Sequence, residues 1–364
     1  MEYIIAIFIV ILGILYNKKM SQSVRKAYLG LILIYIILLI GFRYRVGIDT
    51  INYMRAYPLS PLLHNFWNID IFNERFEPGY LLICAICKLF SKDFWLPQLV
   101  MTAITNCCVF IFLFRYCKNP FIGIFIYFIL QWLYFSTEII RESVAIGIFL
   151  LNYRNIERKR WVKYYLLSLL SIFFHYSAII IWFIPLAKFI KFNIYYLLAC
   201  CILLAITPIV ERLNALLSIA AVAGRIDQYV ASAETLNLNW RVAEFIKSAF
   251  PAIGAVALLT YYKINYKFKP IALLQILFCA GAFAIPIIFS RFTNYTSIFI
   301  IVIISNLLDI RKIKLSVRVL FVGFILITQL NYYYKMYRAW IPYISIFDPQ
   351  HIRERESLWW EYNH

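Results

Sequence analysis

Long apolar stretches alternate with short polar segments along almost the whole chain. A helix needs about 20 apolar residues to cross a bilayer, and fewer where the membrane thins. The alternation therefore predicts an all-α polytopic integral membrane protein with about twelve transmembrane helices. These helices are expected near residues 2–16, 27–42, 94–114, 120–136, 138–152, 162–174, 176–190, 193–209, 243–262, 270–289, 292–308 and 316–331.

Basic residues in the short polar segments set the predicted orientation, because cytoplasmic loops are enriched in Lys and Arg. Four such segments are expected in the cytoplasm: 17–26, 154–163, 263–269 and 311–318. The alternation then places the following on the outer face: the stretch 43–78, the turn 136–142, a hairpin tip at His175, the loop 210–242 and a C-terminal tail 332–364. The apolar piece 79–90 is too short to cross, and we interpret it as a half-membrane segment.

Composition agrees with a lipid environment, since 63% of residues are hydrophobic and only 15% are charged. Residues 1–364 are expected to form a single transmembrane domain, and the first apolar segment is expected to be retained as a span. The formal net charge is +18. In a membrane protein such basic loops contact anionic lipid head groups, so we expect membrane lipid rather than nucleic acid as the partner. The tryptophans of the tail, Trp340, Trp359 and Trp360, are expected at the membrane interface.

The sequence holds no recognisable cofactor or metal motif. Eight cysteines lie almost all in apolar segments, where a free thiol behaves as a small hydrophobe. Cys84 and Cys87 form a C-x-x-C, but no histidine or second cysteine pair accompanies it, so a zinc site is not expected. Phosphate-binding loops, dinucleotide fingerprints and hydrolase signatures are absent. We therefore predict neither a cofactor nor a metal ion.

Arg141 is the strongest candidate for a functional residue. It lies in an otherwise apolar region, with Glu138 three residues before it and Glu142 beside it. Ionisable groups at membrane depth are costly and are frequently functional. The alternative is an ion pair between Glu138 and Arg141 that closes a helix end. Arg291 has the same character, and its alternative is a side chain that extends to the membrane interface.

Further charges gather on the predicted outer face. Arg43 and Arg45 follow a span, and Asp49 and Glu77 lie in the same stretch. Clustered guanidinium groups bind phosphate oxygens through paired hydrogen bonds, so this face could hold a diphosphate. Arg225 lies in the outer loop 210–242 and is a further candidate for binding the substrate.

His175 is one of four histidines, and it lies at the tip of the predicted hairpin. The unperturbed pKa of histidine, near 6.5, suits it to take a proton from a hydroxyl group. A single histidine at a hairpin tip can equally serve as a structural hydrogen-bonding group. The sequence does not decide between these two roles.

Five segments in order resemble the EpsG family of Wzy-type polymerases of O-antigen, capsule or exopolysaccharide. They read GFRYRVGIDTINY, FEPGY, EIIRESVAIGIFLL, FFHYSAIIIWFIPL and SRFTNY, and the resemblance covers roughly residues 27–310. It implies a GT-C-like glycosyltransferase that works without a metal ion. Its partners would be undecaprenyl-diphosphate-linked oligosaccharide repeats, as donor and acceptor, and a chain-length regulator protein. The implied reaction takes place on the outer face of the bacterial cytoplasmic membrane.

The resemblance also suggests roles for the candidate residues. Arg141 and Arg291, with Arg43 or Arg45, and with Arg225, would bind the diphosphate. His175, or else Glu77 or Asp49, would take the proton of the acceptor hydroxyl. The main alternative function is a flippase for the same lipid-linked sugar, although the chain lacks the repeated halves of many transporters. A membrane acyltransferase is a third alternative, and the sequence lacks an obvious histidine-centred signature for it.

Overall fold

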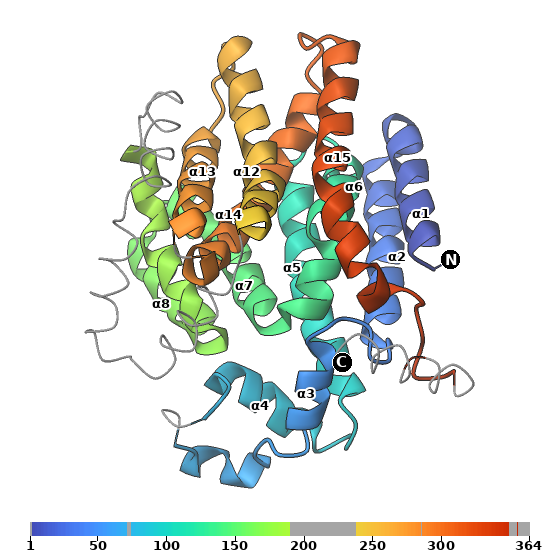
Figure 1. Ribbon diagram of the computed structural model, residues 1–364, viewed down its shortest axis with the longest axis vertical. Helices are drawn as coiled ribbons and strands as arrows, with labels where there is room; N and C mark the ends of the chain where they lie inside the picture. The colour runs from blue at the N-terminus through green and yellow to red at the C-terminus, as the bar shows by residue number, and fades with distance from the viewer. Residues whose placement is uncertain (1, 71–73, 190–237, 285, 349–354, 356–364) are drawn as a thin grey trace. The chain divides into compact units, whose positions relative to one another are not determined.

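The structure is a computed structural model that describes residues 2–70, 74–189, 238–284, 286–348 and 355 (Figure 1). These residues form helices and loops and contain no β-strand, which confirms the prediction of an all-α protein. The chain divides into two compact units. Unit 1 comprises Met1–Ile179 and Tyr333–His364, and unit 2 comprises Ile180–Tyr332.

Unit 1 contains long helices and, at one end of them, a group of short ones. The long helices are α1 (Glu2–Tyr16), α2 (Gln22–Gly41), α5 (Trp95–Tyr116), α6 (Pro120–Leu130), α7 (Ile140–Glu157) and α8 (Trp161–Phe174). The short helices are α3 (Thr50–Ala56), the 3₁₀ helix η2 (Leu63–Asn68) and α4 (Pro78–Cys87). Figure 1 shows α3 and α4 beyond the ends of α5 and α7.

Local sequence signals explain where several of these helices begin. The hydroxyl group of Ser21 accepts a hydrogen bond from the Val24 amide at 3.3 Å and so caps α2. Asn119 caps α6 in the same way, and Pro120 occupies the first helical position. Side-chain oxygens suit the N-cap because the first helical amides lack a partner within the helix, and proline loses nothing at that first position.

Polar and small residues hold α7 against its neighbours α5 and α8. The Thr105 hydroxyl of α5 lies 3.1 Å from the Ser143 hydroxyl of α7. Nearby, Gly147 of α7 packs closely on α5, because a Cβ there would lie only 3.0 Å from Cys108 Cβ. On the other side, the Asn152 amide donates to the Tyr164 carbonyl of α8 at 2.8 Å. Small residues and hydrogen bonds between helices are the usual means of helix association in lipid.

The connection between α6 and α7 is a π-helical turn, Tyr134–Glu138. Such turns insert an extra residue into the helical path and occur frequently at functional sites. The turn directs Glu138 toward the chain segment that follows α2, and it lets α7 begin at Ile140, directly before Arg141. The sequence predicted a boundary in this region, but not its π-helical geometry.

Unit 2 contains the 3₁₀ helix η5 (Ile184–Phe189) and the helices α12 (Leu238–Tyr261), α13 (Lys269–Ala284), α14 (Pro286–Leu308) and most of α15 (Leu315–Trp340). Helix α13 packs against both α12 and α14. Gly254 of α12 lies against the Phe321 ring of α15, where a Cβ would come within 2.6 Å of the ring.

Five of the described helices are long and apolar enough to cross a membrane, which confirms a multi-pass membrane protein. They are 22–41, 95–116, 242–261, 288–308 and 315–340. Several other predicted spans are shorter apolar helices, and the predicted span 193–209 lies outside the described residues. The predicted half-membrane segment corresponds to α4, which has only 10 residues.

The segment 176–190 was predicted to be one transmembrane helix, but in the structure two 3₁₀ helices replace a single α-helix there. They cover Tyr176–Trp182 and Ile184–Phe189. A run of three isoleucines, 179–181, reduces helix propensity, and Pro185 cannot donate a helical hydrogen bond.

The end of the chain packs against the loop after α2. Helix α15 continues to Trp340, beyond the predicted end of its span at residue 331. After it, Tyr44 donates its amide to the Ile344 carbonyl at 2.8 Å, and the Ile346 amide donates to the Phe42 carbonyl at 2.9 Å. The side chain of Trp340, which was predicted to lie at the membrane interface, is buried within the protein, and its indole donates to Glu138 Oε1 at 3.2 Å.

Candidate functional site

The sequence Phe-Glu-Pro-Gly-Tyr, residues 76–80, leads into helix α4, and Glu77, Pro78 and Gly79 each have a distinct role there. Glu77 is the N-cap of α4 in an extended conformation, and Pro78 supplies the first helical position. Gly79 lies against the end of α8, where a Cβ would be 2.8 Å from the Phe173 carbonyl oxygen. Glycine therefore allows α4 to approach α8 closely, and this brings Glu77 to the residue that follows α8, His175.

Arg141 lies in the first turn of α7 and forms an ion pair with Glu77, from Nη1 to Oε2. Its Nε donates to the Tyr53 hydroxyl at 3.3 Å. The guanidinium carbon lies 4.8 Å from the centre of the Phe76 ring, 5.7 Å from that of Tyr53 and 5.9 Å from that of Tyr80. Aromatic faces attract cations, so these three rings stabilise the guanidinium from several sides.

His175 follows α8 in an extended conformation, φ −158° and ψ 125°. The Ser177 amide donates to its Nδ1 at 3.2 Å, and the Ser177 hydroxyl lies 2.7 Å from the same atom. Because Nδ1 accepts a hydrogen bond, the neutral imidazole carries its proton on Nε2. That atom lies 3.8 Å from Glu77 Oε1. The N–H of His175 therefore faces the carboxylate.

The cluster of Glu77, Arg141 and His175 is enclosed but not sealed. The side chains are 7%, 19% and 14% exposed, respectively. A buried charge is tolerated only when it is paired and hydrogen-bonded, and Glu77 has a cation on one oxygen and an N–H group near the other. The arrangement can bind an anion at the exposed edge of Arg141 and can accept a proton at Glu77.

The family model of the EpsG family matches residues 26–345. The chain belongs to the EpsG family. EpsG is a family of Wzy-like polymerases, so the chain is a polysaccharide-polymerase-like membrane protein of glycosyltransferase type. No curated protein and no solved structure matches the chain. The five segments through which the sequence resembles EpsG proteins all lie within the matched residues.

Four of these EpsG segments meet in the cluster around Arg141. The first supplies Tyr53, the second Phe76, Glu77 and Tyr80, the third Arg141, and the fourth His175. The loop charges predicted that these segments lie on the outer face of the membrane. The contacts bring the four segments together at one end of unit 1. The fifth segment carries Arg291, which lies on α14 in unit 2.

Sequence reasoning missed the role of Glu138, whose carboxylate is held by the loop after α2. Oε1 accepts from the Ile48 amide at 3.2 Å and Oε2 from the Asp49 amide at 3.1 Å. The Thr137 hydroxyl donates to Oε1 at 2.9 Å. These contacts contradict the alternative interpretation of the sequence, in which Glu138 would form an ion pair with Arg141. Glu138 binds backbone amides, and among the described residues the acid that pairs with Arg141 is Glu77.

The structure gives Arg43 a supporting position rather than an exposed one. Its side chain is buried, with Nη1 donating to the Ile40 carbonyl at 2.7 Å and Nε to the Val46 carbonyl at 3.0 Å. Burial lowers the pKa of the guanidinium to about 10. Arg43 thus satisfies carbonyls at the end of α2 and shapes the loop.

The remaining predicted residues lie apart from the Arg141 cluster or outside the described residues. Arg45 adopts a positive φ of 50°, and its carbonyl accepts a hydrogen bond from Arg355 at 3.0 Å. Asp49 lies at the N-terminus of α3, with its amide bound to Glu138. Arg225 lies outside the described residues. Within the described part of the chain, no group of three or more His, Cys, Asp and Glu residues could hold a metal ion.

The Glu138 contacts depend on Gly47, which gives a testable prediction. Gly47 has φ +101°, and a Cβ there would lie 2.7 Å from Thr137 Cβ and 3.1 Å from Glu138 Oε1. We expect Gly47→Ala to destabilise the protein by about 1–3 kcal/mol, because a side chain at this φ is strained and would also push Glu138 away. The measurement is thermal unfolding in detergent.

Gly30→Ala is the matched control for this prediction. Gly30 lies within α2, and an added Cβ would meet no atom within 4 Å. Alanine is favoured over glycine inside a helix, so this variant should unfold at the same or a slightly higher temperature. Equal unfolding temperatures for both variants would show that Gly47 is not needed to hold Glu138.

Proposed function

We propose that the protein is a GT-C-like polysaccharide polymerase with about twelve transmembrane helices. It joins undecaprenyl-diphosphate-linked oligosaccharide repeats by glycosyl transfer at the outer face of the bacterial cytoplasmic membrane. The observation that carries the proposal is the cluster of Glu77, Arg141 and His175 in a chain of the EpsG family. The cluster combines a cation for a phosphate leaving group with a carboxylate for the acceptor proton.

Arg141 is suited to bind the diphosphate of the donor. Its Nη1 bonds Glu77 and its Nε bonds Tyr53, whereas Nη2 forms no hydrogen bond with any residue that the structure describes. A guanidinium can bind two phosphate oxygens through its planar edge. Such a donor, placed where negative charge develops on the leaving group, lowers the barrier of the transfer. Arg291 and Arg225 remain proposed contributors to diphosphate binding.

Glu77 is better placed than His175 to take the proton. Glu77 Oε1 lies 3.8 Å from His175 Nε2, which is longer than a hydrogen bond and leaves that oxygen open to a hydroxyl group. His175 presents a protonated Nε2 while its Nδ1 is bound by Ser177.

The proposed step forms one bond and breaks one bond. The acceptor hydroxyl oxygen attacks the anomeric carbon of the donor sugar, and its proton passes to Glu77 Oε1. The bond between the anomeric carbon and the phosphate oxygen breaks, and the diphosphate leaves with the electron pair, bound to Arg141. His175 positions the carboxylate electrostatically, because its Nε2–H group lies 3.8 Å from Oε1, beyond hydrogen-bond distance. In this reaction the residues of the chain bind charge and move one proton.

Purified protein in lipid vesicles tests the proposal directly. Vesicles supplied with lipid-linked repeats, with and without a chelator of divalent cations, should yield a ladder of longer glycans on a gel. A ladder that persists with the chelator supports a reaction without a metal ion. Movement of lipid-linked repeats across the vesicle membrane with no ladder would instead support the flippase alternative.

His175→Ala separates an orienting role from that of the base. If His175 positions Glu77, we expect the rate of polymerisation to fall by about 10–100-fold, the loss seen when residues that position metal ligands are removed. Loss of a general base would instead lower it by about 10²–10⁴-fold. His175→Gln, which keeps an N–H donor, should retain more activity than His175→Ala. The exposed His64, replaced with alanine, is the control that should leave the rate unchanged.

A further inference from the structure

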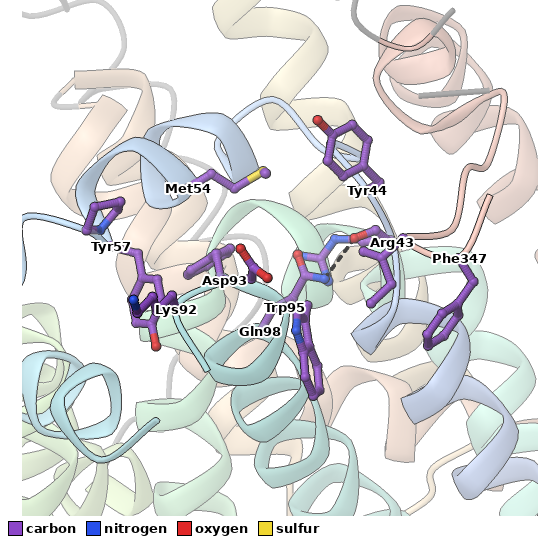
Figure 2. Close-up of a pocket in the computed structure, with 12 residues that line it drawn as sticks. Arg43, Tyr44, Met54, Tyr57, Lys92, Asp93, Trp95, Gln98 and Phe347 are labelled. Atoms are coloured by element: carbon purple, nitrogen blue, oxygen red, sulfur yellow. Dashed lines mark hydrogen bonds between the residues drawn. The ribbon is translucent and has the colours of Figure 1, made fainter. Parts of the chain in front are cut away.

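A pocket of about 400 Å³ opens in unit 1 beside the loop that follows α2. Its volume lies in the range that proteins use for small ligands, about 300–1,000 Å³. Three segments form it: the loop and α3 region 43–58, the start of α5 with the residues before it, 92–98, and the C-terminal residues 346–347. Figure 2 shows Tyr57, Asp93, Gln98 and Phe347 in this pocket, from these separate segments.

Aromatic rings and a small number of polar groups line the pocket. The rings belong to Tyr44, Tyr57, Phe94, Trp95 and Phe347. The polar groups include the exposed side chains of Lys92 and Asp93. Among the described residues, no group forms a hydrogen bond or an ion pair with the Asp93 carboxylate. Arg43 also lines the pocket, and its buried Nη2 has no hydrogen-bond partner in the described part of the chain.

The pocket shares a wall with the cluster around Arg141. The Phe94 ring lines the pocket and stacks on the Tyr53 ring, with centroids 6.1 Å apart and planes 10° apart. Tyr53 in turn accepts a hydrogen bond from Arg141. Two rings therefore separate the pocket from the guanidinium. A substrate whose diphosphate lies at Arg141 would carry its sugars within reach of this pocket.

We propose that this pocket binds a pyranose ring of the oligosaccharide repeat. A pyranose has an apolar face that packs on aromatic rings and hydroxyl groups that donate to a carboxylate and accept from cations. The pocket combines the Asp93 carboxylate with the cations Arg43 and Lys92, which suits sugar hydroxyl groups because they both donate and accept. A lipid chain would leave Asp93 and Arg43 without partners. This inference rests on the proposed function, since it names the part of the same substrate that the pocket recognises.

The test uses oligosaccharides released by partial acid hydrolysis from the polysaccharide of the source strain, titrated onto the full-length protein in detergent by calorimetry. Wild-type protein should bind them saturably. Trp95→Ala and Asp93→Asn should each weaken binding about tenfold, because one removes an aromatic face and the other a charged acceptor. Trp67→Ala is the matched control, since Trp67 is 85% exposed and lies outside the pocket.

Polymerisation assays of the same variants show whether the bound pyranose ring belongs to the donor substrate or to the acceptor substrate. A raised KM for the acceptor with an unchanged KM for the donor places the acceptor sugar in the pocket, and the reverse places the donor sugar there. Absence of saturable binding by the wild type, or equal affinities for Trp95→Ala, Asp93→Asn and the control, would overturn the proposal. Pocket-dependent binding by a protein that makes no polymer would support the pocket and reject the polymerase function.

Discussion

Arg141→Ala is expected to abolish long-chain polymer while the protein still inserts into the membrane. The substitution removes the guanidinium that we propose binds the leaving diphosphate. Loss of one preorganised donor to developing negative charge lowers enzymatic rates by about 10²–10³-fold. The measurement is glycan chain length in cells that carry the variant as their sole copy, together with the ladder assay on purified protein.

Two further arginine variants separate catalysis from folding. Removing one partner of a buried ion pair costs about 3–5 kcal/mol, so Arg141→Ala also destabilises the protein through the unpaired Glu77. Arg141→Lys keeps the charge but not the planar edge, and it should fold while retaining only a small part of the activity. Arg154→Ala changes an exposed arginine near the end of the same helix and should leave chain length unchanged. Normal chain lengths from Arg141→Ala would remove Arg141 from the mechanism.

Part of the site could be predicted from the sequence, because burying a charged side chain in a membrane costs free energy. Arg141 stood out because a guanidinium within an apolar segment needs a partner, and Glu77 is that partner. Loop charges placed 43–78, 136–142 and His175 on one face, and the contacts among Glu77, Arg141 and His175 bring members of these segments together. The sequence did not say which carboxylate would pair with Arg141, because Glu138 is nearer to it along the chain.

The parts that sequence reasoning missed depend on the path of the backbone. Glu138 binds the amides of Ile48 and Asp49, and every residue carries such an amide, so no residue type marks the partner. Arg43 binds two carbonyls for the same reason. The only local signal is the glycine before Ile48, since Gly47 has a positive φ that other residues rarely adopt. The 3₁₀ helices after His175 could have been anticipated from Pro185 and the isoleucine run.

Glu77→Gln is the second variant with a large expected effect. Glutamine keeps the size of the side chain but removes the charge, so it cannot take the acceptor proton. We expect polymerisation to fall by about 10²–10⁴-fold, the contribution of a general base. The three aromatic rings around Arg141 remain in this variant, so the cation stays stabilised and the protein should fold. Rates of ladder formation by purified protein measure the effect.

Three further variants test the role of Glu77: a change at the nearby Glu74, a conservative change at Glu77 itself, and a double change with Arg141. Glu74→Gln makes the same chemical change three residues earlier and should leave the rate unchanged. Glu77→Asp keeps a carboxylate and should retain more activity than Glu77→Gln. Because Glu77 and Arg141 act as one unit in the proposed step, the double variant should lose little more activity than the more damaging single variant. Losses that multiply would mean that the two residues act independently, and an active Glu77→Gln would transfer the role of base to another group.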